Sequence, residues 1–125
     1  MAPAMAQSTS QVPMRSAAAP AIDRVHLKQM TFGDRGLECE LLQLFDRQAE
    51  MLMTRMRQSD ASILAMLAHT LKGSAVGVGA HDVAAAAAAA EQAASAPAAE
   101  RTAALQRLAA AIDAARAEIA VLLRA

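Results

Sequence analysis

Residues 68–74 read Ala-His-Thr-Leu-Lys-Gly-Ser, and they place a nucleophile, a cation and a glycine within two turns of a predicted helix. A neutral imidazole is nucleophilic, so a ring nitrogen of His69 can attack phosphorus and carry a phosphoryl group. The Lys72 ammonium, one turn later, can offer positive charge to the phosphoryl oxygens. Gly73 costs a helix interior about 1 kcal/mol relative to alanine. Its presence here predicts that a bulky phosphoryl donor needs the room that a side chain would fill.

The helix that carries this motif is predicted to point His69 away from the protein core. With about 100° of rotation per residue, the positions opposite His69 form the expected core stripe: Leu64, Leu67, Leu71, Ser74, Ala75 and Val78. The outer stripe around His69 contains Ser62, Ala65, Met66, Lys72, Gly73 and Val76. This stripe is unusually apolar for a surface, and exposed apolar patches often mark partner contacts. We therefore take Ser62, Ala65, Met66 and Val76 as candidate partner-binding residues.

The elements around the motif are predicted to be helices. Strong helix formers dominate the chain, whereas Val, Ile and Thr are too sparse to build a sheet. Apolar spacing and turn residues predict a short helix over 22–30 and four long ones over 35–57, 61–78, 80–95 and 98–123. Asp34 and Asp60 are expected to cap two of them, and Gly79 is expected to end a third. We expect an all-α fold, an antiparallel four-helix bundle with a short N-terminal capping helix.

Two segments differ from the rest in composition. Residues 1–21 are rich in Ala, Pro, Ser and Gln, so we expect a flexible N-terminal tail before a domain over 22–125. Residues 84–90 are all alanine, which leaves Val83 as the only larger aliphatic on the inward face of that helix. In the helix over 35–57, one stripe is predicted to be buried: Leu37, Leu41, Leu44, Phe45, Leu52 and Met56.

Composition argues against several classes of function. Net charge is zero, and no dense Lys/Arg cluster is available for a nucleic-acid backbone. Cys39 is the only cysteine, so neither an internal disulfide nor a multi-cysteine metal site is possible. No apolar run reaches the roughly 20 residues that span a bilayer, and a cytoplasmic location is expected. His26 and His81 have no partners at useful spacing and are interpreted as surface residues. We expect no metal, no cofactor and no nucleotide loop.

The motif and its surroundings resemble histidine-containing phosphotransfer (HPt) domains. The likeness rests on the run Ala68 to Ala75 followed by Gly79-Ala80, and it extends to Phe32-Gly33-Asp34 before a helix and to Ser59-Asp60 before the motif helix. Glu91 closes the next helix in a matching place. The alanine run over 84–90 departs from the family, which usually has larger aliphatic residues there. It predicts either close helix approach or a loosely held helix.

The resemblance implies a four-helix bundle that exchanges a phosphoryl group between an exposed histidine and the aspartate of receiver domains. His69 is then the phosphoacceptor, Lys72 helps to hold the phosphoryl group and Gly73 gives access. The expected partners are response-regulator receiver domains or a hybrid histidine kinase, and Mg²⁺ is expected on the receiver. The chain is too short to hold an ATP-binding kinase domain beside the bundle. We therefore expect a stand-alone, monomeric phosphoryl carrier and not an enzyme.

Two other functions remain open from the residues. A non-catalytic helical adaptor would bind a receiver or kinase through the same apolar stripe, although it would need neither His69 nor Lys72. A structural or dimer-forming bundle would bury Met66 and Val76 between two copies.

Overall fold

The computed structural model describes residues 20–125, so the predicted tail lies outside the described residues except for Pro20 and Ala21. Five helices and no strands are present in this range. They are α2 (Arg24–Met30), α3 (Arg35–Arg57), α4 (Ala61–Val78), α5 (His81–Ala93) and α6 (Ala98–Arg124). The all-α prediction is confirmed, and every long helix begins and ends within a few residues of its predicted bounds.

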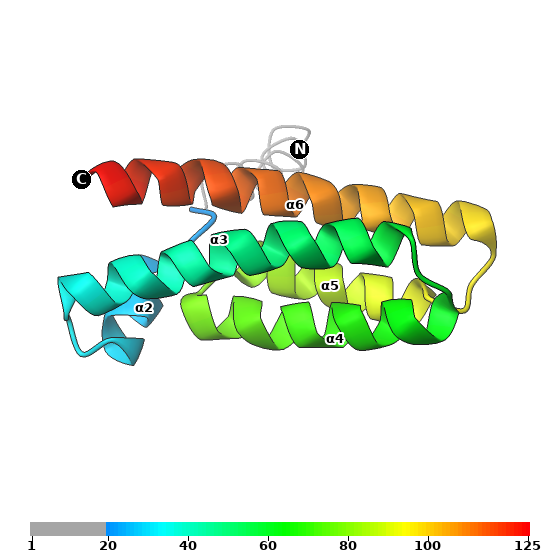
Figure 1. The fold of residues 1–125 in the computed structure, drawn as a ribbon, viewed down its shortest axis with the longest axis horizontal. Coiled ribbons are helices and arrows are strands. Elements are labelled where there is room, and N and C mark those ends of the chain that lie inside the picture. The colour runs from blue at the N-terminus through cyan, green and yellow to red at the C-terminus, as the bar shows by residue number, and fades with distance from the viewer. Residues whose placement is uncertain (1–19) are drawn as a thin grey trace, which may run out of the picture.

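The four long helices lie side by side along the length of the molecule, and the short α2 lies at one end (Figure 1). The helix α4 packs against both α3 and α5, α6 closes the bundle against the same two helices, and α2 contacts α4. By length and composition alone α4 would also be able to cross a membrane. In the bundle, however, α4 supplies one side of the core.

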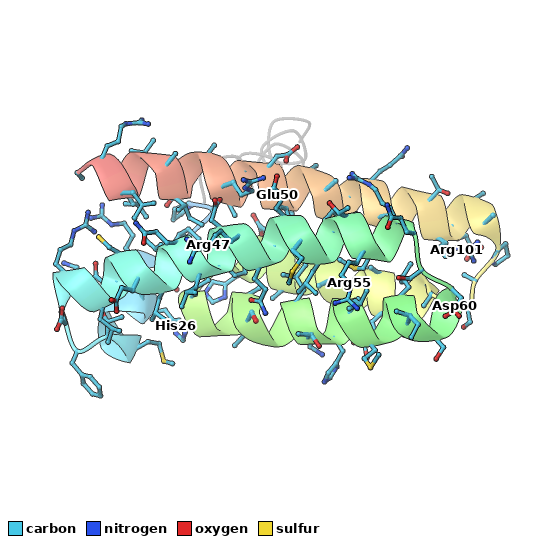
Figure 2. All side chains as sticks on the ribbon, viewed as in Figure 1. His26, Arg47, Glu50, Arg55, Asp60 and Arg101 are labelled. Carbon is cyan, nitrogen blue, oxygen red and sulfur yellow. The ribbon has the colours of Figure 1, made fainter. Side chains whose placement is uncertain are left out.

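Aspartates fix where three of the helices begin. The side chains of Asp23, Asp34 and Asp60 each accept a backbone N–H bond from the third residue after them. Asp60 lies at the turn between α3 and α4 (Figure 2). Gly79 ends α4 with φ at 82°, in the left-handed region that favours glycine. The predicted caps at Asp34 and Asp60, and the predicted stop at Gly79, are confirmed.

The core lies along the bundle axis and follows the predicted stripe of α4. In α4 the buried residues are Leu64, Leu67, Ala68, Leu71, Ala75 and Val78, whereas Ser74 is half-buried. In α6 they are Leu108, Ile112, Ala115, Ile119 and Leu122. The helix α5 contributes Val83, Ala86, Ala87 and Ala90. Because alanine side chains are short, α5 can approach its neighbours closely, and these alanines are at most 1% exposed.

The predicted buried stripe of α3 is wrong at two positions, and at a third, Leu41, the side chain is only half-buried. Leu37 and Leu44 are 37% and 55% exposed, whereas Phe45, Leu52 and Met56 are buried as expected. The inward face of α3 is completed by residues that the prediction omitted, among them Leu42 and Ala49. The buried face of α3 is therefore turned toward these residues. Leu37 and Leu44 lie on a flank of the helix, where no other helix covers them fully.

Candidate functional site

His69 lies near the middle of α4 and points out of the bundle. Its side chain is 68% exposed, whereas the neighbouring Ala68 and Leu71 are fully buried. The predicted orientation is therefore correct. Of the other outer-stripe residues, Ser62, Met66, Gly73 and Val76 are exposed, and Ala65 and Lys72 are half-buried.

A carboxylate from the next helix lies within hydrogen-bond distance of one ring nitrogen of His69. The Nδ1 atom of His69 lies 3.2 Å and 3.3 Å from the two carboxylate oxygens of Glu91 in α5. The Glu91 side chain is 33% exposed, so it is partly sheltered between the helices. With its proton on Nδ1, His69 donates to Glu91 and leaves the Nε2 lone pair free. The free nitrogen is then the one available for nucleophilic attack.

Glu91 was expected at the end of its helix but was not predicted as a site residue. The signal was nevertheless in the chain. The helices α4 and α5 are joined by only Gly79 and Ala80, so they must run antiparallel and pair residues equally distant from that turn. His69 and Glu91 stand 22 residues apart and satisfy this pairing.

Lys72 and Gly73 lie one turn beyond His69 on the same helix. The Lys72 ammonium has no ion-pair partner among residues 20–125, so its charge is available to an incoming anion. A Cβ atom built on Gly73 would meet nothing within 4 Å. The protein's own packing therefore does not require glycine at this position, and the space beside His69 is open to a partner.

An apolar groove, which sequence analysis missed, lies between α2, α3 and α4. Its volume is about 230 Å³. Its lining consists of Met30, Leu41, Leu44, Phe45, Gln48, Ser74, Gly77 and Val78. Met30 and Leu44 are 50% and 55% exposed at its rim, and Phe32 in the adjoining turn is 93% exposed. The groove reaches α4 at Ser74 and Gly77, on the flank of α4 that faces α3.

A second histidine–carboxylate pair ties α2 to the turn between α4 and α5. His81, at the start of α5, is exposed as expected, but the expectation that it has no partner is wrong, because its Nε2 atom is 3.0 Å from Oδ2 of Asp23. The backbone N–H of His26 and the side chain of His81 lower the pKa of Asp23. The backbone N–H of Asp23 donates to the Gly79 carbonyl over 2.8 Å. The His26 and His81 rings meet edge to face with centroids 6.0 Å apart.

Other ionic contacts join α3 to α6. Arg116 donates to Asp46 over 2.8 Å and lies 3.5 Å from Glu50, which faces α6 in Figure 2. The Asp46 carboxylate raises the pKa of Arg116. Within residues 20–125 no group of three His, Cys, Asp or Glu side chains has the arrangement of a metal site. These contacts hold helices together and lie apart from His69.

Comparisons with known proteins agree with the geometry. A sequence profile described as the Hpt domain matches residues 40–118, which include all of α4 and α5. The fold is similar to the X-ray structure of a putative histidine-containing phosphotransfer protein from rice, with a TM-score of 0.75 and 20% identity. That match covers 98% of this chain and 93% of the rice chain. A search of curated proteins gave no significant match. Because the profile spans more than half of the sequence, this chain belongs to the Hpt domain family.

Proposed function

We propose that His69 accepts a phosphoryl group from the aspartate of one receiver domain and passes it to the aspartate of another. The contact between Nδ1 of His69 and Glu91 carries this proposal, because it leaves Nε2 free on an exposed face. Membership of the Hpt family supports receiver domains as the partners. A hybrid histidine kinase would donate the phosphoryl group by the same chemistry, because its receiver domain presents the same aspartyl phosphate.

In the uptake step, the Nε2 lone pair attacks phosphorus in line with the aspartyl oxygen of the donor. The N–P bond forms as the O–P bond breaks, and the aspartate leaves as a free carboxylate. Charge spreads over the three equatorial oxygens, where the Lys72 ammonium stabilises it. Gly73 leaves room for the donor's active site to approach. Mg²⁺ belongs to the receiver in this account, because Hpt proteins carry no cofactor of their own.

The partner would dock on the outer stripe of α4 and on the groove beside it. Met66 and Val76 are 57% and 49% exposed, and Ser62 and Ala65 complete the stripe. The apolar rim at Met30 and Leu44 extends this surface across α3 toward α2. Together they form a mostly apolar face around one reactive histidine, which suits a transient protein partner.

The direct test is transfer from a receiver domain that carries a labelled aspartyl phosphate. Wild-type protein should take up acid-labile label, and His69→Gln should take up none. The matched control, His81→Gln, removes the other histidine paired with a carboxylate and should label like wild type. Receiver binding without label in wild-type protein would favour the non-catalytic adaptor instead. A dimer that appears with rising concentration in light scattering and hides Met66 would favour the structural bundle.

The docking surface needs a separate test. Leu44→Glu places a charge at the rim of the groove and should weaken receiver binding by about tenfold or more. Val121→Glu is the control, because Val121 is 54% exposed on α6, across the bundle from α4. Uptake of phosphoryl from a small donor such as phosphoramidate should be equal in both variants. If both variants bind the receiver equally well, the groove is not part of the receiver-binding surface.

A further inference from the structure

We propose that the negative charge of Glu91 keeps phospho-His69 in its labile, transfer-ready form, so that Glu91 sets how long the phosphoryl group stays on the protein. This inference rests on the proposed function, since it requires His69 to carry the phosphoryl group. It assigns to Glu91 a role beyond orienting the ring. An uncharged hydrogen-bond acceptor at the same place would orient the ring equally well but would not have this effect.

The geometry gives Glu91 a close and undivided contact with His69. Both carboxylate oxygens lie within 3.3 Å of Nδ1, and Glu91 makes no other ion pair among the described residues. The carboxylate is two-thirds covered, at 33% exposure, so water screens it less than it screens a free surface charge. Lys72 lies one turn beyond His69 on α4, and the proposed function assigns its charge to the incoming phosphoryl group.

The chemistry of the N–P bond depends on the proton at Nδ1. When Nε2 carries phosphorus and Nδ1 keeps its proton, the ring is formally cationic. Attack by an aspartate oxygen or by water then breaks the N–P bond, its electron pair returns to Nε2, and neutral imidazole leaves. Without the Nδ1 proton the leaving group would be an imidazolate anion, which is far more basic and leaves more slowly. A carboxylate at Nδ1 stabilises the cationic ring and therefore favours the labile form.

Orientation and charge can be separated at this position. The amide oxygen of a glutamine can accept the same Nδ1–H bond, so Glu91→Gln preserves the ring tautomer but removes the charge. An alanine removes both the bond and the charge. A charge-assisted hydrogen bond is roughly twice as strong as a neutral one. Glu91→Gln should therefore weaken the bond to Nδ1 but keep the ring tautomer, whereas Glu91→Ala should lose both.

The experiment loads the wild-type and variant chains with phosphoryl from phosphoramidate and measures the decay of phospho-His69 at one fixed, mildly alkaline pH. Glu91→Gln should lengthen the lifetime by about fivefold, a ratio typical of exchanging a charged for a neutral hydrogen bond. It should slow transfer to a receiver by a similar factor. Nitrogen-15 spectra of the His69 ring should report the Nδ1–H tautomer in wild type and in Glu91→Gln but a mixture in Glu91→Ala.

The control is Glu100→Gln, an exposed carboxylate in the first turn of α6, and it should leave the lifetime unchanged. Equal lifetimes in wild type and Glu91→Gln, with the tautomer preserved, would overturn the inference while leaving His69 as the carrier. A shorter lifetime in Glu91→Gln would also overturn it. If wild type and every variant take up phosphoryl at a site other than His69, the proposed function fails first.

Discussion

Two histidine–carboxylate pairs in this molecule look alike but are built into different surroundings. His69 and Glu91 approach to 3.2 Å, with side chains 68% and 33% exposed, and His81 and Asp23 approach to 3.0 Å, with side chains 60% and 38% exposed. The first pair joins the middle of α4 to the end of α5. The second joins the start of α2 to the start of α5. Distance and exposure alone therefore do not identify a phosphotransfer site.

The difference lies in which nitrogen is held and in what surrounds it. Glu91 binds Nδ1 of His69 and leaves Nε2 free, whereas Asp23 binds Nε2 of His81. Asp23 is also engaged elsewhere, because its other oxygen caps α2. His69 is followed by Lys72 and by the open position at Gly73, whereas Ala84 stands three residues after His81. The proposed reactivity of His69 therefore rests on a free outer nitrogen, a nearby cation and open space, in addition to its carboxylate.

Among the features that distinguish His69 from His81, the open space at Gly73 should have the largest effect on the rate of phosphoryl uptake. Gly73→Leu should fold normally, since a Cβ there meets nothing within 4 Å. It should nevertheless slow phosphoryl uptake from a receiver by about a hundredfold, because small misplacements of reacting groups are costly. Ala110→Leu, on the exposed face of α6, is the control for adding the same side chain. Stopped-flow transfer rates compare them, and a normal rate in Gly73→Leu would remove the steric argument.

A smaller effect should follow loss of the cation. Lys72→Ala should slow transfer by about tenfold while receiver affinity changes little, because the charge acts mainly on the phosphoryl oxygens. Lys72→Arg keeps the charge and should recover part of the rate. Measuring rate and affinity separately distinguishes this role from docking. If affinity falls and the rate at saturation is unchanged, Lys72 is a docking residue only.

Disrupting the pair of His81 and Asp23 should have the smallest effect, and it should change the stability of the fold but not phosphoryl transfer. The pKa of Asp23 is lowered in the folded protein. Its ionised carboxylate therefore stabilises the fold at pH values above the ordinary pKa of a carboxyl group, and this stabilisation is lost as the pH falls through the lowered pKa. Asp23→Asn keeps the cap on α2 but loses the charge. The urea midpoint of wild type should exceed that of Asp23→Asn at pH 7, and the two should converge as the pH falls below the ordinary range of a carboxyl group.

Glu40→Gln changes an exposed carboxylate of α3 and should show no such convergence. Phosphoryl uptake by Asp23→Asn should match wild type at neutral pH. A strong loss of uptake in that variant would mean that the two histidine pairs are coupled, and the contrast drawn between them would no longer hold.

Much of the fold was predictable because its signals are local. Residues near in sequence determine the caps at Asp34 and Asp60 and the end of α4 at Gly79. They also determine the apolar stripe of α4, from which the outward orientation of His69 was predicted. The features that were missed depend on tertiary placement. Glu91 reaches His69 only through the antiparallel pairing of α4 and α5. The exposure of Leu44 depends on how α2 and α4 pack around α3, which helical periodicity in α3 does not encode.

We propose that His69, and not His81, carries the phosphoryl group. The most direct measurement is mass-spectrometric mapping, under alkaline conditions, of the chain after transfer from a phosphorylated receiver. We expect one modified residue, His69, with phosphorus-31 spectra assigning the bond to Nε2. Label on His81, or on Nδ1 of His69, would contradict it.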